Sequence, residues 1–433
     1  MIIVDSALKR REEENNPIRV GMCGAGAMAR GVALQIIRST PGMELSAIAN
    51  RTVTNGLRAF AEAGVEDAVV CENAEHFEKA LFDRNPAVVA DPELLASSEN
   101  IDVVLEVTGT IDFALKTVLT AIAHSKPVVL MNAELDGTVG PILKRRADAN
   151  NTIITACDGD QPGVEMNLFR FVKGLGMEPL VCGSMKGMLD HYRTPETQAA
   201  FAAEWDQGVE MVTSFADGTK VSFEQAIVAN GTGMKAPKRG LYAYEHRDHI
   251  DTMTSRYDLD EIKELGGIVD FAIGATPGPG VYVFATQENS LHLPYLDLYK
   301  LGKGPLYSFY TPYHLCYFEV PTSIARVALF DDVVLAPMGK PYVDVVATAK
   351  KDLVPGERLD GVGGFTCYGQ CESAEITYRD RLLPMGVSHD CIVKRHISKD
   401  SVLTYSDVDI PEGRLIDELR AEQDSAFGSQ LSA

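Results

Sequence analysis

The stretch Pro17-Ile-Arg-Val-Gly-Met-Cys-Gly24-Ala-Gly26-Ala-Met-Ala29 joins a short apolar segment to a glycine-rich turn and then to a helical pattern. Gly24 allows a tight turn out of a strand, and Gly26 lets the backbone approach a pyrophosphate closely. Ala29 stands where the fingerprint has its third glycine, and a small residue there keeps the helix against the sheet. The N–H groups at the start of the helix would face the anion. The residues expected to contact the dinucleotide here are Gly24, Gly26, Ala27 and Met28.

The segments that follow alternate between strand and helix patterns. This alternation is typical of a doubly wound parallel sheet with right-handed crossovers, so it places the glycine turn where a Rossmann sheet binds a dinucleotide. An additional helix is expected between residues 71 and 86, before the third strand. We expect strands over 43–50, 87–90, 101–107, 127–131 and 152–156, and helices over 31–39 and 111–124.

The chain divides by pattern into an arm and three domains. Residues 1–16 form a charged helical arm, and residues 17–157 form an α/β Rossmann domain that binds NAD(P). Residues 158–344 mix helices and strands and form an α+β domain for catalysis and substrate binding. They include a helix over 313–330, interrupted at Pro321, that returns to the first domain. Residues 345–433 contain short strands between glycine turns and form a small all-β domain.

Composition excludes several classes of protein. The 433 residues carry a formal net charge of −21, whereas nucleic acids and anionic membranes need a basic surface. No run of 18 apolar residues is present, and Lys9–Glu14 is too charged for the apolar core of a signal peptide. The eight cysteines are scattered, and Cys367 and Cys371 lack a second ligand pair, so we expect reduced thiols and no metal motif. These features predict a cytoplasmic protein.

The end of the second expected strand decides between NAD and NADP. An acidic residue there would bind the 2′-hydroxyl of NAD, whereas a basic residue accommodates the 2′-phosphate of NADP. The strand ends Ala47-Ile-Ala-Asn50-Arg51-Thr52, without a carboxylate, so Asn50, Arg51 and Thr52 favour NADPH as the cofactor. The alternative is that Arg51 is a solvated loop charge.

Two later loops are expected to touch the cofactor. Thr108 and Gly109 follow the strand over 101–107, where a turn of small residues leaves room for the nicotinamide half of the cofactor. Asn132 follows the next strand, and its amide would bond the nicotinamide ribose or carboxamide. The alternative for Asn132 is a side chain that simply terminates the strand.

The first domain resembles that of homoserine dehydrogenases in Ile101-Asp-Val-Val-Leu-Glu-Val-Thr-Gly109 and Lys126-Pro-Val-Val-Leu-Met-Asn132. Those enzymes have Asn-Lys where this chain has Asn132-Ala133, which makes homoserine a poor substrate. The tail resembles the SAF domain, a β-clip fold, in the pattern basic-basic-x-Ile-x-x-x-x-x-Leu-Thr-x-x-Asp-Val over 394–408.

The whole chain resembles the DRL family of 1-deoxy-D-xylulose 5-phosphate reductoisomerase-like oxidoreductases. The resemblance rests on Asp158-Gly-Asp-Gln-Pro-Gly163, on Lys186-Gly-Met-Leu-Asp-His-Tyr-Arg-Thr-Pro195 and on the SAF-like tail. It implies NADPH-dependent conversion of 1-deoxy-D-xylulose 5-phosphate to 2-C-methyl-D-erythritol 4-phosphate, a step of isoprenoid biosynthesis. A divalent metal would suit such a substrate, although no ligand motif supports it.

This chemistry needs a group that polarises a ketone, an acid/base and cations for a phosphate. Lys186 is expected as the electrophile or proton donor, and Asp190 would orient it if the segment is helical. His191 or Arg193 would meet the substrate, while Arg239 with Lys235 and Lys238 would clamp the anion. Glu165 would begin a helix at the site, with Asp158 and Asp160 as further candidates. The alternative for each charged residue is an ordinary surface position.

Three functions stay open at this point. The first is the reductoisomerase, and the second is an NAD(P)-dependent dehydrogenase of an unphosphorylated polyol, sugar acid or semialdehyde. The third is a non-catalytic sensor that binds NADP(H). A phosphorylated substrate requires several of Lys186, Arg193, Lys235, Lys238 and Arg239 to converge. We also expect a homo-oligomer, with no nucleic-acid or membrane partner.

Overall fold

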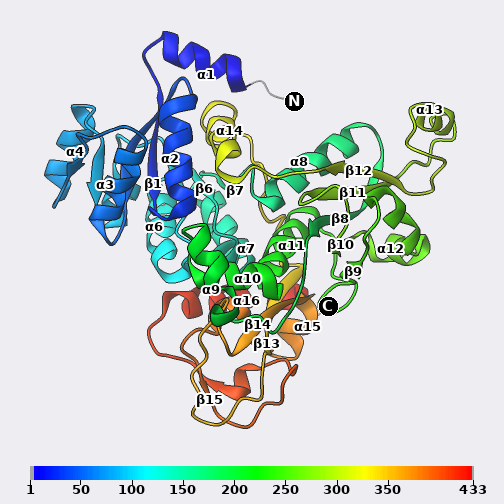
Figure 1. Cartoon of the computed structure of the whole chain (residues 1–433). Helices are drawn as coiled ribbons and strands as arrows, with labels where there is room; N and C mark the ends of the chain where they lie inside the picture. Colours follow the sequence, from blue (N-terminus) through cyan, green and yellow to red (C-terminus); the bar gives the residue numbers. More distant parts are fainter. Residues whose placement is uncertain (1–3, 432–433) are drawn as a thin grey trace. The chain divides into compact units, whose positions relative to one another are not determined.

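The computed structural model describes residues 4–431 and divides into two compact units (Figure 1). Unit 1 contains Met1–Asp136, Ile142–Asp160 and Leu315–Ala336. Unit 2 contains Gly137–Pro141, Gln161–His314 and Pro337–Ala433. Over residues 4–431, every helix is too short or too polar to cross a bilayer.

Unit 1 is built on a seven-stranded parallel sheet in the order β3-β4-β2-β1-β5-β6-β7. This sheet confirms the expected Rossmann-like α/β fold. β1 pairs with β2 on one side and with β5 on the other, so the strand order reverses at β1. A ligand site in such a sheet lies outside the carboxyl ends of the strands at this reversal. The strands are β1 (Ile18–Cys23), β2 (Met43–Ala49), β3 (Val69–Val70), β4 (Ala87–Val89), β5 (Val103–Glu106), β6 (Val128–Leu130) and β7 (Ile154–Ala156).

The helices of unit 1 follow the expected alternation, with differences at their ends. α2 begins at Ala27 rather than Gly31, directly after the glycine turn. α14 runs through Pro321 without the expected interruption, and its buried face joins the core of the sheet. The helices are α1 (Val4–Glu13), α2 (Ala27–Ser39), α3 (Val53–Glu62), α4 (Ala74–Phe82), α5 (Pro92–Ser97), α6 (Ile111–Ala123), α7 (Ala133–Ala149) and α14 (Cys316–Phe330).

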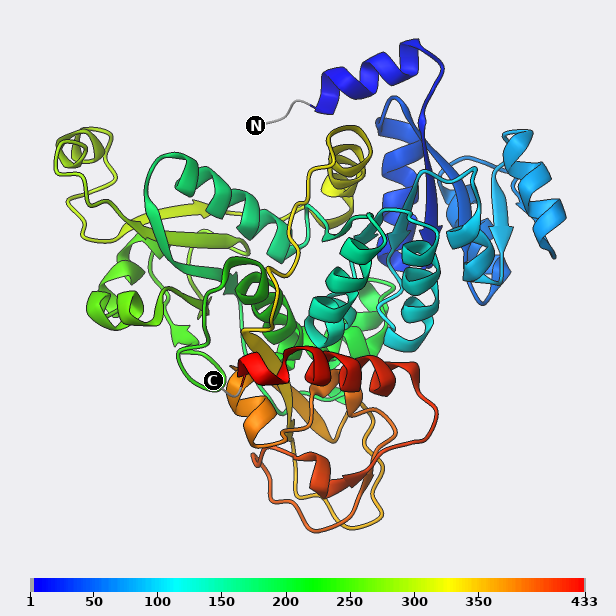
Figure 2. The ribbon, with the colours of Figure 1, turned by 180° about the vertical axis from the view of Figure 1, so that it is seen from behind.

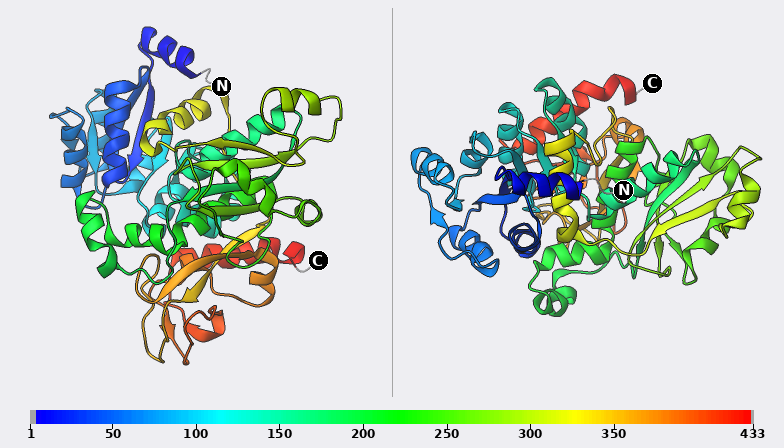
Figure 3. Two further views of the ribbon diagram at one scale, coloured as in Figure 1. Left: turned by 45° about the vertical axis from the view of Figure 1, so that its right-hand side comes forward. Right: turned by 90° about the horizontal axis from the view of Figure 1, so that it is seen from above.

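Unit 2 contains a five-stranded mixed sheet in the order β12-β11-β8-β10-β9 (Figure 3). β8 is central and pairs parallel with β10 and antiparallel with β11. The strands are β8 (Glu178–Lys186), β9 (Tyr244–Glu245), β10 (Ile268–Ile273), β11 (Val281–Thr286) and β12 (Tyr307–Thr311). The helices of this part are α8 (Gln161–Gly174), α9 (Pro195–Glu204), α10 (Val209–Asp217), α11 (Thr219–Thr232), α12 (Leu259–Leu265) and α13 (Leu293–Leu298), with a 3-10 helix over Ile250–Arg256.

The C-terminal part of unit 2 contains two small antiparallel sheets. They pair β13 (Val343–Ala349) with β14 (Cys367–Ser373), and β15 (Ile392–Val393) with β16 (Val408–Asp409). Two helices accompany the expected strands and were not predicted from the sequence. They are α15 (Ala374–Arg379) and α16 (Leu415–Leu431), and Figure 2 shows α16 in red beside the orange segment that contains α15. All eight cysteines have free thiols.

Candidate active site

The glycine turn of unit 1 has the geometry of a dinucleotide cradle. Gly24 adopts φ +116°, and a Cβ there would lie 3.0 Å from the carbonyl oxygen of Val107. Gly26 is the N-cap of α2 and has no side-chain cap, and nothing lies within 4 Å of a Cβ built on it. Ala29 is buried against the core, as expected. A helix start without a side-chain cap, beside open space, suits a pyrophosphate.

The end of β2 presents an arginine and no carboxylate. The Asn50 side chain donates to the carbonyl oxygen of Thr52 at 2.8 Å, which shapes the turn into α3. Arg51 is exposed, and its guanidinium lies 5.5 Å from the centre of the Phe113 ring. A preference for NADPH over NADH stays a prediction.

The loop after β5 is organised by a residue that sequence reasoning missed. The Glu106 carboxylate accepts from the Thr108 N–H at 2.9 Å and from the Thr108 hydroxyl. The Thr110 N–H donates to the Thr108 hydroxyl oxygen at 3.2 Å. The Asn132 amide donates to the Thr110 carbonyl at 3.2 Å and accepts from the Leu135 N–H at 3.1 Å, which caps α7. We call Glu106, Thr108, Thr110 and Asn132 the Glu106 network.

Glu106 is fully buried, and burial raises its pKa to about 7. Its Oε2 atom has no hydrogen-bond partner among residues 4–431. A buried polar atom without a partner is uncommon and is often found where a ligand binds or a group titrates. The open cradle and this polar loop together fit a dinucleotide on unit 1. When bound in its reduced form, such a cofactor supplies a hydride.

Lys186 of unit 2 is the last residue of β8 and lies in a polar cluster. Its ammonium donates to Gln161 Oε1 at 2.7 Å and pairs with Glu224 Oε2 at 3.2 Å. The side chains of Lys186 and Glu224 are 16% and 4% exposed. Gln161 Nε2 also lies 3.4 Å from His314 Nε2. A mostly desolvated lysine held by two oxygens is a fixed proton donor.

Glu165 extends this cluster into the interior of unit 2. It is fully buried on α8, and Gln225 Nε2 donates to its Oε2 at 3.0 Å. Burial raises the pKa of Glu165 well above its ordinary value. Glu165 Oε1, Gln225 Oε1 and Ser184 Oγ have no partner in the described chain. We call Gln161, Glu165, Ser184, Lys186, Glu224 and Gln225 the Lys186 cluster.

Glu224 and Gln225 could not be identified from the sequence. They lie on α11, where nearly every residue is buried, so no polar face marks them. Gln161 belongs to the quoted Asp158–Gly163 motif, which was the available signal for it.

The loop after β8 gives Asp190, His191 and Arg193 partners other than Lys186. The segment is not helical, so the condition for Asp190 to orient Lys186 is not met. Asp190 instead pairs with Arg193 at 3.0 Å. His191 donates from Nδ1 to the Asp217 carbonyl at 2.7 Å and stacks on Tyr368.

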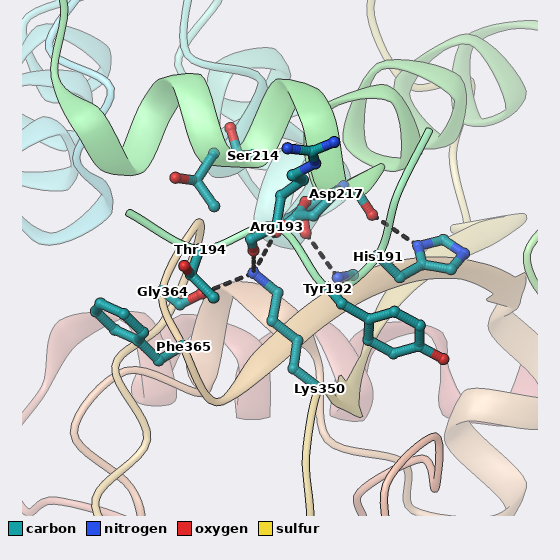
Figure 4. Close-up of polar contacts among 12 residues, drawn as sticks. His191, Tyr192, Arg193, Thr194, Ser214, Asp217, Lys350, Gly364 and Phe365 are labelled. Atoms are coloured by element: carbon teal, nitrogen blue, oxygen red, sulfur yellow. Dashed lines mark hydrogen bonds and ion pairs between the residues drawn. The ribbon is translucent and has the colours of Figure 1, made fainter. Parts of the chain in front are cut away.

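A buried lysine from the C-terminal part anchors this loop (Figure 4). Lys350 Nζ donates to the carbonyl oxygens of Arg193 at 2.8 Å and Gly364 at 2.7 Å, and it pairs with Asp217 Oδ2 at 2.7 Å. The side chains of Lys350 and Asp217 are 2% and 0% exposed. These contacts fix the backbone of the loop that carries His191 and Arg193, which indicates a structural role for the loop. We call Lys350, Asp217, Arg193 and Gly364 the Lys350 anchor.

The residues expected to form an anion clamp, Arg239, Lys238 and Lys235, each contact a different partner. Arg239 pairs with the buried carboxylate of Glu372 at 2.7 Å. Lys238 lies over the Tyr242 ring, and Lys235 is exposed beside β10. The partners of these three residues are therefore Glu372, Tyr242 and Ile268, and not Lys186.

The acidic candidates near residue 158 belong to unit 1. Asp158 pairs with Arg326 at 3.0 Å and accepts from Ser323 at 2.9 Å, which ties α14 to the end of β7. Asp160 follows in the same turn. Within residues 4–431, no group of three or more His, Cys, Asp or Glu side chains is arranged to hold a metal ion.

Residues 159–320 match the family model described as oxidoreductase DRL, catalytic domain. This segment includes Lys186, Glu224 and the rest of the Lys186 cluster. No curated protein sequence matches the chain. The family match supports an oxidoreductase as the class of protein.

Several solved structures are similar at low identity. A 1-deoxy-D-xylulose 5-phosphate reductoisomerase from Zymomonas mobilis in complex with NADPH is 17% identical, covers 48% of this chain and 56% of that chain, and has a TM-score of 0.36. A "probable dehydrogenase" from Thermotoga maritima is 12% identical, with coverages of 74% and 90% and a TM-score of 0.38. A myo-inositol 2-dehydrogenase from Lactobacillus plantarum is 14% identical, with coverages of 63% and 75% and a TM-score of 0.36. The chain spans about half the length of the first solved chains that it matches.

Proposed function

We propose that the protein is an NAD(P)H-dependent oxidoreductase that interconverts a carbonyl and an alcohol on a small polyhydroxylated substrate without a phosphate group. Unit 1 would hold the dinucleotide at the Gly24–Gly26 cradle, and unit 2 would hold the substrate at the Lys186 cluster. The observation that carries the proposal is the pairing of Lys186 with Glu224 and Gln161 inside the segment that matches an oxidoreductase catalytic domain.

The cluster supplies the acid/base chemistry of such a reaction. For reduction, the Lys186 ammonium would give a proton to the carbonyl oxygen of the substrate, and the neutral amine would then regain a proton from solvent. Oxidation of the alcohol runs the same transfers in reverse. Glu224 and Gln161 fix the ammonium by hydrogen bonds at 3.2 and 2.7 Å, so the donor is positioned before substrate binds.

The charge of the cluster favours an unphosphorylated substrate. The positive charge of Lys186 is balanced by Glu224, and burial favours the neutral form of Glu165 by raising its pKa. A phosphate dianion requires cations that are free to bind it. Glu165, Gln225 and Ser184, all fully buried, add hydrogen-bonding groups and no cation to the cluster, which suits a hydroxylated substrate better than a phosphate.

A reductoisomerase acting on 1-deoxy-D-xylulose 5-phosphate is the second candidate. The match of residues 159–320 to the DRL catalytic domain favours it. The pairing of Arg193 with Asp190 and of Arg239 with Glu372 weighs against it, because both cations already have carboxylate partners.

A substrate panel separates the two candidates. NADPH and NADH absorbance would be followed with unphosphorylated ketoses, polyols, sugar acids and semialdehydes, and with 1-deoxy-D-xylulose 5-phosphate, each with and without Mg²⁺. We expect turnover of an unphosphorylated compound. Turnover of 1-deoxy-D-xylulose 5-phosphate alone would establish the second candidate, and binding of NADPH without any turnover would contradict both.

A further inference from the structure

Glu106 occupies a special position in the sheet of unit 1. It is the last residue of β5, and its register partner on β1 is Cys23, the residue directly before Gly24. On its other side it pairs with Leu130 at the end of β6, two residues before Asn132. Because the strand order reverses between β1 and β5, Glu106 lies at the point where parallel α/β sheets bind their ligands.

The hydrogen bonds of the Glu106 network connect the Glu106 carboxyl to the loop that follows β5. Thr108 contacts Glu106 through both its N–H and its hydroxyl, and Thr110 is bonded to Thr108 and to Asn132. Gly109 adopts φ +67° between the two threonines. Two fully buried side chains hold the loop: Asn132 holds its Thr110 end, and Glu106 holds its Thr108 end by accepting both hydrogen bonds from Thr108.

We propose that Glu106 is a positioning residue that holds the Thr108–Thr110 loop in the form that binds the nicotinamide half of the dinucleotide. The inference rests on the proposed function, because it assumes that unit 1 binds NAD(P)H. The adenosine ribose is read at the end of β2, so the half of the ligand over β5 and β6 carries the nicotinamide. Glu106 is fully buried, and it therefore acts through Thr108 and Thr110 rather than on the ligand directly.

Ionisation of Glu106 gives this role a measurable signature. Both bonds from Thr108 go to Oε1, and they are stronger when the carboxylate is ionised; a proton on Oε2 would weaken them and would itself have no acceptor among residues 4–431. The titratable groups that face Glu106 are Cys23 on β1 and Glu134 on α7. Burial keeps the Cys23 thiol neutral by raising its pKa, and the charge of Glu134 helps to raise the pKa of Glu106.

The loop is therefore held more firmly when Glu106 is ionised, and the population of the ionised form rises through pH 7. With a pKa of about 7, affinity for the nicotinamide half would be weaker at pH 6 than at pH 8 by up to about tenfold, because the apparent dissociation constant scales inversely with the competent fraction. ADP-ribose lacks the nicotinamide, so its affinity would not follow this profile. NADH is the better probe, since the 2′-phosphate of NADPH itself titrates near pH 6.

The test measures dissociation constants of NADH and ADP-ribose from pH 6 to pH 8 for the wild type, Glu106→Gln and the control Glu44→Gln on β2. We expect Glu106→Gln to weaken NADH about tenfold at pH 8, to flatten its pH profile and to leave ADP-ribose within about twofold. Glu44→Gln should behave as the wild type. If Glu106→Gln does not fold, the wild-type profiles still decide: a flat NADH profile overturns the proposal.

The outcomes separate this inference from the proposed function. Equal NADH affinity and an equal pH profile for Glu106→Gln and the wild type would overturn the role of Glu106 while leaving dinucleotide binding intact. Failure of the wild type to bind NADH, NADPH and ADP-ribose would overturn the proposed function and the inference together. Parallel loss of NADH and ADP-ribose affinity in Glu106→Gln would show general damage to unit 1 and overturn the specific role.

Discussion

At the scale of single residues, Gly24 and Gly26 are needed for different reasons. Gly24 has a positive φ and would press a Cβ against the Val107 carbonyl, so the fold itself requires glycine there. Gly26 adopts an ordinary φ of −75° with open space around it. The fold does not need glycine at position 26, whereas the proposed binding of a pyrophosphate would need it.

This difference predicts that Gly26→Val folds normally and loses affinity for the dinucleotide. The valine would occupy the space that the pyrophosphate needs, and we expect NADPH affinity to fall at least about tenfold. Gly208→Val is the matched control, because Gly208 is also an N-cap with nothing within 4 Å of its Cβ position. Calorimetric titration and thermal unfolding of both variants check the prediction, and equal NADPH affinities would contradict it.

Sequence reasoning found the cradle because its constraints are local, from one turn to the helix that follows. It missed Glu106, which stands inside the apolar run Ile101–Val107 and gains its importance from pairing with Cys23, 83 residues away by number. It also allowed Asp190 to orient Lys186 if the segment were helical, whereas the segment is a loop tied by Arg193 and Lys350. The role of such a residue depends on contacts with residues that are distant in the sequence, and a single sequence does not reveal those contacts.

At the scale of elements, the Lys350 anchor ties β13 to the loop after β8 and to the end of α10. A buried ammonium with three oxygen partners leaves a costly uncompensated carboxylate when it is removed. Lys350 therefore contributes to the cohesion of unit 2.

We expect Lys350→Met to lower the free energy of unfolding by about 3–5 kcal/mol, because Asp217 would remain buried without its cation. Lys351→Met is the control: Lys351 pairs with Glu357 at the surface with its side chain 52% exposed, and its loss should cost at most about 1 kcal/mol. Urea unfolding measures both changes. Equal losses of unfolding free energy in the two variants would contradict the stabilising role of the Lys350 anchor. Partial recovery of that free energy in the double variant Lys350→Met/Asp217→Leu would support it.

Elements with a clear apolar run were predictable to within about two residues, as for β2, β6 and β7. α15 and α16 were not predicted, and α14 was expected to break at Pro321 although tertiary packing holds it continuous. Packing overrides local preference at these elements, which is why their pattern alone did not reveal them.

At the scale of the whole molecule, the two units divide the proposed chemistry. Unit 1 carries the cradle and the Glu106 network, and unit 2 carries the Lys186 cluster. The net charge of −21 makes an anionic substrate unfavourable unless cations are free to bind it, and the candidate cations Arg193 and Arg239 are paired. The homo-oligomer and the preference for NADPH stay predictions.

The most direct test compares Lys186→Met with Lys263→Met, using the substrate that the panel identifies. Lys263 is also an ion-paired lysine of unit 2, but it lies at the surface with Glu288. The account predicts that Lys186→Met keeps wild-type dinucleotide affinity while kcat/KM falls by about 100-fold or more, and that Lys263→Met keeps full activity. Turnover by Lys186→Met at the rate of Lys263→Met would contradict it.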